Sequence, residues 1–359
     1  NAGAGGGGPY WCGFLVMAPW QTWLNYGDPS LVERHYPAMR EWMGYVERYM
    51  KDGLLTRWPD TPYRDWFLGD WLAPHGVDTG SEASVSLVNN CFVSDCYARM
   101  AQMARLTGHD DEAAAFEARR EALNRTIHAR FYDPATQTYA TGSQLDMTYP
   151  MLVGATPDSL RAGVEQRLFR LTHDVMKDHI GGGLVGVPVI TRWAVRSHNP
   201  EFIYRMLKQR GYPGYLHMID HGATATWEYW SGERSRVHNC YNGIGTWFYQ
   251  ALGGLRTDSS HPGYEHVFID PQIPEGVEWC RIGKETPYGR IDLGWEIADG
   301  ELRIDVTLPP GVTATAITPA GACRGRLDGR RLAPQSPGTK IASGRHRLVF
   351  GLAPQNERQ

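Results

Sequence analysis

The chain has 359 residues and a mass of 40.3 kDa, enough to bury roughly three quarters of its unfolded surface in a large and a smaller domain. Its 36 Lys and Arg residues are balanced by 39 Asp and Glu residues, so no basic field favours nucleic acid. All apolar runs are shorter than the roughly 20 residues that span a bilayer. We therefore expect a globular protein that binds neither nucleic acid nor membranes.

Aromatic residues are unusually frequent, with 13 Trp, 18 Tyr and 10 Phe. Flat rings in a cleft pack against the apolar face of a sugar, so this composition favours a carbohydrate ligand. The six cysteines form no C-x-x-C pair, and the histidines near them lack the spacing of zinc ligands. We therefore expect no metal site, no cofactor and no dense disulfide framework.

A glycine-rich run, residues 1–8, is followed at once by Pro9, Tyr10 and Trp11. The run lacks the charged start and the apolar core of a signal peptide. Two interpretations remain equally open: a flexible linker, or a backbone that approaches a ligand closely beside an aromatic ring.

From residue 11 to about residue 252, the apolar residues recur with helical periodicity, and Gly, Pro and Asp separate the segments. About nine helices are predicted, mostly as hairpins. The clearest are residues 14–26, 31–50, 83–106, 110–131, 158–174, 186–197, 200–210 and 241–252. Gly108 is predicted to end the helix that precedes it. Repeated helical hairpins are typical of an α/α toroid and equally of a solenoid.

After Gly253 the pattern changes to short alternating runs that end at Gly or Pro, such as residues 291–297 and 302–308. Alternation of this kind predicts strands with one buried face. We therefore expect a helical domain, residues 1–258, and a small antiparallel β domain, residues 259–359.

One of two long stretches without periodicity, residues 212–237, contains a candidate catalytic carboxyl group. Glu228 lies between Trp227 and Tyr229, and aromatic neighbours that partly bury a carboxyl group favour proton transfer by it. A surface Glu near a helix end is the alternative. His238 follows closely and is predicted either to bind a sugar hydroxyl or to serve as a structural hydrogen-bonding group.

The other such stretch, residues 52–82, brings Asp65, Trp66, Asp70 and Trp71 within seven residues. Carboxylates accept hydrogen bonds from neighbouring sugar hydroxyls, and indole rings cover the apolar sugar face. A core Trp and an Asp that stabilises a turn are the structural alternatives.

Four segments follow one another in a characteristic order along the chain. They are Gly5-Gly-Gly-Gly-Pro-Tyr-Trp11, Gly69-Asp-Trp71, Gly222-Ala-Thr-Ala-Thr-Trp-Glu-Tyr-Trp230, and His238 with Trp247 nine residues later. In order and rough spacing they resemble the bacterial α-L-rhamnosidases of glycoside hydrolase family 78. The resemblance covers nearly the whole chain, since residues 286–291 are similar to the start of a strand in that family's β domain.

This resemblance implies an (α/α)6 toroid followed by a C-terminal β-sandwich, and hydrolysis of terminal α-L-rhamnosides with inversion at the anomeric carbon. Glu228 then corresponds to the general base that activates water. Trp11 and Trp71 correspond to rings of the rhamnose pocket, and His238 to a pocket histidine. We add Trp66, Asp70 and Trp227 as predicted sugar-binding residues.

The general acid of the family lies in an Arg-Asp-Glu segment several dozen residues upstream of the Gly-Gly-Gly-Pro loop. The nearest similar segment here, Arg64-Asp65-Trp66, has no Glu. About nine predicted helices also compare with twelve in a toroid of six hairpins. We therefore expect a chain that begins inside the barrel and lacks the acid.

Two functions of other classes are open at this point. A different α/α-toroid enzyme, such as a polysaccharide lyase, would need a Tyr or His base and a cation for the uronate carboxylate, for which Arg64 is available. A sugar-binding protein without catalysis is the other, because the acid is missing.

Overall fold

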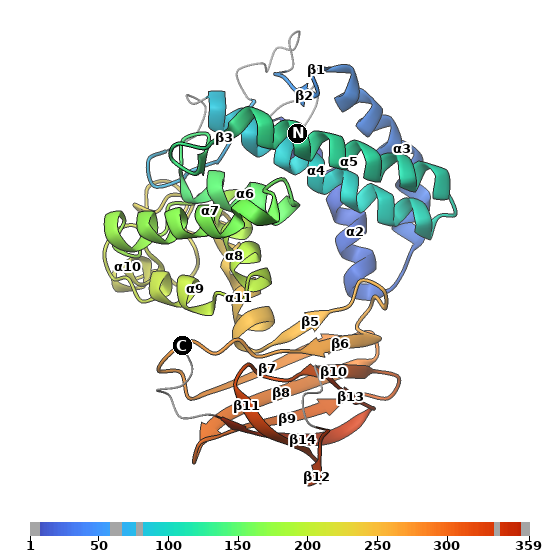
Figure 1. Cartoon of the computed structure of the whole chain (residues 1–359), viewed down its shortest axis with the longest axis vertical. Helices are drawn as coiled ribbons and strands as arrows, with labels where there is room; N and C mark the ends of the chain where they lie inside the picture. Colours follow the sequence, from blue (N-terminus) through green and yellow to red (C-terminus); the bar gives the residue numbers. More distant parts are fainter. Residues whose placement is uncertain (1–7, 58–66, 77–81, 334–337, 353–359) are drawn as a thin grey trace. The chain divides into compact units, whose positions relative to one another are not determined.

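The computed structural model describes residues 8–57, 67–76, 82–333 and 338–352 (Figure 1). Its contacts divide the chain into two units. The first consists of Asn1–Trp20, Ser30–Ser197 and Phe202–Ile244, and the second of Gln21–Pro29, His198–Glu201 and Gly245–Gln359. The last change from the first unit to the second falls between Ile244 and Gly245. The predicted domain boundary lies between residues 258 and 259.

Helices dominate the chain as far as residue 252. They are α1 (Pro9–Cys12), α2 (Phe14–Tyr26), α3 (Ser30–Arg48), α4 (Glu82–Leu106), α5 (Asp110–Phe131), α6 (Gln144–Val153), α7 (Asp158–Arg170), α8 (Gly186–Arg196), α9 (Pro200–Leu207), α10 (Tyr215–Asp220) and α11 (Gly245–Trp247), with the short π-helices η3 (Leu171–Val175) and η5 (Phe248–Leu252) and the 3-10 helix η4 (Asn242–Ile244). Two small antiparallel hairpins, β1 (Met50–Lys51) with β2 (Leu54–Leu55) and β3 (Tyr132–Asp133) with β4 (Thr138–Tyr139), lie between them.

Seven of the eight helical segments with the clearest periodicity are confirmed, and the bounds of α2 and α5 agree to the residue. The eighth, residues 241–252, is not one α-helix but the succession of η4, α11 and η5. Three helices escaped prediction. All ten residues of α6 are buried, so no alternation of apolar and polar faces marks it in the sequence. The helices α1 and α10 have only four and six residues, too few for a helical period to show.

The α4–α5 hairpin shows how the sequence ends one helix and begins the next (Figure 1). Gly108 has φ +76°, a left-handed conformation that glycine adopts without strain, and its neighbour His109 donates its N–H to Ala104 O at 2.8 Å. The predicted helix end is therefore confirmed. Asp110 and Glu112 in the first turn of α5 complement the positive end of its dipole.

A buried ion pair joins two helices of the first unit. Asp95 on α4 is 6% exposed, and its carboxylate accepts hydrogen bonds from Arg99 and Arg192, each at 3.0 Å. Burial alone would raise the pKa of Asp95, but the guanidinium groups of Arg192 and Arg99 hold it well below its usual range. The helices α4 and α8, which carry these groups, both contact α6.

Two sheets form the second unit. The first has the strand order β13-β10-β6-β5 and the second β12-β11-β14-β9-β8-β7. Their bounds are β5 (Leu255–Thr257), β6 (His266–Ile269), β7 (Trp279–Thr286), β8 (Gly289–Ala298), β9 (Glu301–Leu308), β10 (Thr313–Ile317), β11 (Ala322–Leu327), β12 (Arg330–Arg331), β13 (Gly338–Ile341) and β14 (Gly344–Leu352). Both sheets contribute to one apolar core, for example Val267 and Ile269 from the first and Trp295 and Ile304 from the second.

The prediction of a purely antiparallel β domain is wrong for one pair of strands. β6 and β10 run parallel, with Thr313 opposite His266 and Ala316 opposite Ile269. Parallel neighbours need a long connection, here residues 270–312, and alternation within a strand carries no information about its partner. The segment similar to the start of a strand, residues 286–291, contains the last residue of β7, a short turn and the first three residues of β8, so a strand does begin within it.

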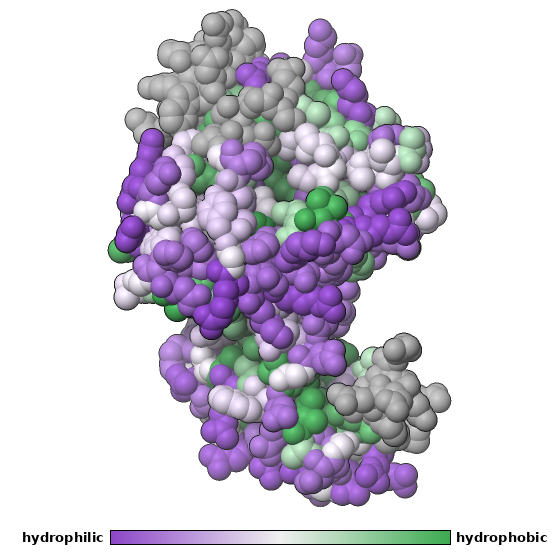
Figure 2. Space-filling model, turned by 90° about the vertical axis from the view of Figure 1, so that its left-hand side faces the viewer, coloured by the Kyte–Doolittle hydropathy of each residue, from purple (hydrophilic) through white to green (hydrophobic). Residues whose placement is uncertain are grey.

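On the face drawn in Figure 2, hydrophilic residues cover most of the described surface of the first unit. Within the described ranges, no helix combines the length and the apolar character needed to cross a membrane.

We expect Asp95→Asn to lower the free energy of unfolding by about 3 kcal/mol at neutral pH, because two guanidinium groups lose their buried counter-charge. Because the folded pKa is depressed, the stabilisation by Asp95 is present above its unfolded pKa of about 3.9 and is lost as the pH falls below it. Urea unfolding should therefore show a difference in the free energy of unfolding between wild type and Asp95→Asn that is smaller at pH 3.5 than at pH 7.

The matched control is Glu117→Gln, which removes the exposed pair with Arg105 that also bridges two helices. It should cost less than about 1 kcal/mol. An equal cost for both variants would show that the Asp95 pair does not stabilise the fold through burial.

Candidate active site

Asp70 holds two loops of the first unit together. Its side chain is 3% exposed, and its two oxygens accept N–H groups of Gly183 at 2.7 Å, Val185 at 2.9 Å and Gly186 at 3.0 Å. A Cβ atom on Gly186 would lie 2.6 Å from Asp70 Oδ2, so only glycine lets the backbone approach this closely. Leu184 also donates its N–H to the carbonyl oxygen of Trp71 at 2.7 Å.

Tyr241 connects this first loop with the segment that carries Glu228. Its hydroxyl lies 2.8 Å from Leu72 O and 3.0 Å from Glu228 O, and its single proton is shared between the two carbonyl groups. Burial raises the pKa of Tyr241, which keeps the phenol protonated. The ring stacks on Trp230 at 3.9 Å between centroids, and Trp230 Nε1 donates to Gly182 O at 3.0 Å. Three segments distant in the sequence therefore meet at Tyr241 and Trp230.

Backbone hydrogen bonds between two adjacent segments hold Glu228 in place. The N–H of Glu228 donates to Ser235 O at 2.8 Å, and the N–H of His238 donates to Thr226 O at 2.8 Å. The Glu228 side chain is half-buried, with the Ser235 N–H 3.4 Å from Oε2. Burial, with further contributions from the charges of Glu228 and Asp70, raises the pKa of Cys240 to about 11.

The Gly-Pro-Tyr-Trp segment lies against the Asp70 loop. A Cβ atom on Gly8 would be 3.2 Å from the Phe67 ring. Burial raises the pKa of Tyr10; the charge of Arg192 lowers it, and that of Asp70 raises it. Trp11 packs edge-on against Tyr10, with 5.5 Å between ring centroids.

The predicted site residues differ in exposure. Trp11, Trp71, Glu228 and His238 are half-buried, so part of each side chain remains accessible. Asp70 and Trp227 are buried, at 3% and 2% exposure.

The Trp227 ring is covered by the Arg236 guanidinium at 5.2 Å, and a Cβ atom on Gly232 would lie 2.7 Å from the ring. The predicted Trp66, like Asp65 beside it, lies outside the described residues. The sugar-binding roles of all six predicted residues stay predictions.

Tyr10, Tyr241 and the Gly182–Gly186 loop are the parts of this arrangement that sequence reasoning missed. Tyr241 was read only as the first residue of a helix. Three consecutive glycines, Gly181 to Gly183, were a signal, because such a run permits close backbone contacts.

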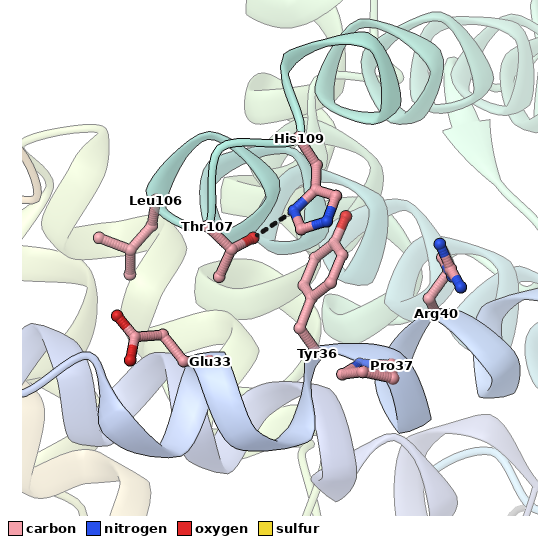
Figure 3. Close-up of a pocket in the computed structure, with 7 residues that line it drawn as sticks. All are labelled: Glu33, Tyr36, Pro37, Arg40, Leu106, Thr107 and His109. Carbon is pink, nitrogen blue, oxygen red and sulfur yellow. Dashed lines mark hydrogen bonds between the residues drawn. The ribbon is translucent and has the colours of Figure 1, made fainter.

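A cavity of about 410 Å³ opens elsewhere in the first unit, between α3 and the turn that joins α4 to α5 (Figure 3). Two of its polar side chains interact with each other, since Thr107 Oγ1 lies 3.0 Å from His109 Nδ1, and Tyr36 donates at 2.7 Å to Glu112, which does not line the cavity. No residue that lines it belongs to the predicted site.

Comparison with known families matches both parts of the chain. Residues 1–252 match the family model described as bacterial alpha-L-rhamnosidase 6 hairpin glycosidase domain, and residues 254–330 match the bacterial alpha-L-rhamnosidase C-terminal domain. The chain belongs to the bacterial α-L-rhamnosidases of glycoside hydrolase family 78. The predicted family is thereby confirmed.

Curated relatives and solved structures agree with this assignment. The α-L-rhamnosidase of Alteromonas sp. (strain LOR) is 24% identical over 328 residues, which cover 86% of this chain and 34% of that protein. The α-L-rhamnosidase of Streptomyces avermitilis is 26% identical over 333 residues, with coverages of 89% and 30%. The chain therefore spans about a third of the length of the curated relatives it matches.

Two solved structures show the same fold. The Streptomyces avermitilis α-L-rhamnosidase in complex with L-rhamnose matches with a TM-score of 0.79 and 22% identity, covering 93% of this chain and 32% of that one. The α-L-rhamnosidase from Dictyoglumus thermophilum matches with a TM-score of 0.85 and 18% identity, with coverages of 96% and 39%. The predicted sequence of a helical part followed by a β-rich part is confirmed.

We expect Asp70→Asn to lower the free energy of unfolding by about 2 kcal/mol or more, because an amide offers one acceptor oxygen where the carboxylate receives three N–H groups. Asp133→Asn is the control: Asp133 also accepts a backbone N–H, from Ala135, but is fully exposed, so its loss should leave urea unfolding nearly unchanged. Unchanged stability for Asp70→Asn together with loss of sugar binding would contradict the structural role.

Proposed function

We propose that the chain carries the base-side half of an inverting α-L-rhamnosidase site, which releases terminal L-rhamnose from glycosides. The observation that carries the proposal is the position of Glu228. Its side chain is half-buried, and its backbone is joined through Tyr241 to the loop of Trp71. The family membership and the relative whose structure is described as a complex with L-rhamnose support the substrate class.

In the proposed mechanism, Glu228 accepts a proton from water, and the resulting hydroxide attacks the anomeric carbon of rhamnose. The glycosidic bond breaks on the opposite face, and its oxygen leaves with a proton supplied by a general acid. In an inverting enzyme the two carboxyl groups stand about 6.5–9.5 Å apart, because the water lies between the base and the sugar.

Asp70 is not proposed as the general acid. Three N–H groups point at its oxygens, so both oxygens act as acceptors, whereas an acid must carry a proton toward the leaving oxygen. The resemblance within the family places that acid in an Arg-Asp-Glu segment, which precedes the Gly-Gly-Gly-Pro loop.

We also propose the finer architecture that the resemblance implies. The hairpins α4–α5 and α6–α7 belong to an (α/α)6 toroid, in agreement with the six hairpins in the description of the matched family model. The shared core of the two sheets in the second unit is what a β-sandwich requires.

We expect Glu228→Gln to reduce hydrolysis of an aryl α-L-rhamnoside by about 10² to 10⁴-fold, because the amide keeps the shape of the side chain and cannot accept a proton from water. An acidic phenol is the leaving group of choice, since it needs little protonation. Release of the phenol is followed by absorbance, and binding of L-rhamnose by calorimetry should change little.

The control for this variant is Glu233→Gln, an exposed carboxyl in the same segment, which should retain wild-type rates. Proton NMR during the first turnovers of the wild type should show the anomer of inverted configuration. Activity of Glu228→Gln within a fewfold of wild type would remove Glu228 from the mechanism, and release of the retained anomer would overturn the single displacement. Rhamnose binding without any turnover would favour a binding protein.

We expect Trp71→Ala to raise the Kd for L-rhamnose by about tenfold to hundredfold, because the ring covers the apolar face of the sugar. Trp11→Ala should act in the same direction. Trp42→Ala removes a half-buried ring of α3 and should leave the Kd unchanged. An unchanged Kd for Trp71→Ala with a lowered Tm would show instead that this ring belongs to the core.

A further inference from the structure

We propose that Asp258, His261 and His266 form a binding site for a divalent transition metal ion, with zinc as the best-suited ion. The three residues belong to the second unit. Asp258 directly follows β5, His266 begins β6, and His261 lies in the connection between these two strands. Among the described residues, this is the one group of three or more His, Cys, Asp or Glu whose ligand atoms converge.

The distances suit a single ion. Asp258 Oδ2 lies 3.0 Å from Nδ1 of His261 and 3.0 Å from Nδ1 of His266, and the three ligand atoms all lie within 4.8 Å of one another. Zinc binds imidazole nitrogen and carboxylate oxygen at about 2.0–2.2 Å, so neighbouring ligand atoms stand roughly 3–3.5 Å apart. The His261 side chain is 54% exposed, so it can rotate to bring its Nδ1 to ligand distance from the same ion as His266 Nδ1.

The two inner ligands are already oriented by other groups. Asp258 Oδ1 accepts the N–H of Ser260 at 2.9 Å, which leaves Oδ2 turned toward the histidines. His266 Nε2 lies 3.0 Å from Thr315 Oγ1 on β10. A metal ion would replace the Nδ1 proton that otherwise bridges to Asp258 Oδ2, and Nε2 would then keep its proton and donate it to this hydroxyl. Outer partners of this kind typically accompany metal-binding histidines.

The donor set distinguishes this cluster from the other His–Asp pairs among the described residues. His173 with Asp178, His198 with Asp270 and His346 with Asp328 each join one imidazole to one carboxylate. At Asp258, two imidazoles meet the same oxygen. Two nitrogens and one oxygen suit zinc and its neighbours in the first transition series, whereas calcium and magnesium prefer oxygen ligands alone.

A bound ion would fasten the β5–β6 connection to β6 through His266, whose other nitrogen lies beside Thr315 of β10. Three protein ligands leave at least one position for water. The expected effect is a more stable second unit, because a ligand that binds only the folded state raises Tm.

The test is zinc binding by the chain after treatment with a chelator and dialysis. Calorimetry with ZnCl2 should give one tight site per chain, and zinc should raise Tm. His261→Ala should weaken this site at least about 100-fold, because a ligand is lost. The exposed position of His261 makes the variant safe for folding, which far-UV circular dichroism verifies. Cobalt should give a visible absorption band in the wild type that His261→Ala lacks.

Two control variants exclude other histidines. His346→Ala removes a His–Asp pair in the same unit, and it should keep the tight site. His221→Ala disrupts the neighbouring rings of His217 and His221, centred 4.2 Å apart, which are the most plausible adventitious site. The proposal is overturned if the chain binds no stoichiometric zinc, if His261→Ala binds it as tightly as wild type, or if His221→Ala alone abolishes the tight site.

Discussion

The candidate active site depends on the burial of one carboxylate. A buried charge is tolerated only where hydrogen bonds replace its lost hydration, and Asp70 obtains these from three N–H groups more than a hundred residues further along the chain. The need of Asp70 for these hydrogen bonds constrains both segments that take part in them. It fixes the backbone of Gly183 and Gly186, and it fixes the loop on which Trp71 follows immediately. An accessible indole thus obtains a defined position from a neighbour that is itself inaccessible.

Buried residues likewise position the more accessible Glu228. Tyr241 and Trp230 are both buried, and they hold the backbone of Glu228 against the Trp71 loop through a shared hydroxyl proton and a stacked ring. Glu228 and Trp71 keep part of their side chains exposed. Buried aromatic residues therefore supply rigidity, and half-buried neighbours remain available to a ligand. A reactive carboxylate on an unsupported loop would need to be ordered at the moment of binding, at an entropic cost.

The sequence revealed those parts of the structure that local patterns determine. Amphipathic helices such as α5 and alternating strands such as β9 have a period that marks them, and both were predicted. The helix α6 was missed because uniform burial leaves no period. Asp70 and Trp227 are of residue types that commonly bind sugars, and nothing in the local sequence shows what they contact instead. Asp70 accepts the N–H groups of Gly183, Val185 and Gly186, and the Arg236 guanidinium covers the Trp227 ring. The exposure of a side chain depends on the whole fold. The residue types alone therefore predicted sugar binding both for buried residues, such as Asp70, and for accessible ones, such as Trp71.

The second unit shows the same limit in its strand pairing. Alternation predicted strands and favoured antiparallel hairpins, but the strand order places β6 beside β10 in parallel. That pairing brings Thr315 to the far nitrogen of His266, while the short connection from β5 brings Asp258 and His261 to the near one. Sequence spacing alone, Asp-x2-His-x4-His, does not distinguish a metal site from three surface residues. The parallel pair supplies what the spacing lacks, because Thr315 Oγ1 can accept the Nε2 proton of His266 when an ion takes the lone pair of Nδ1.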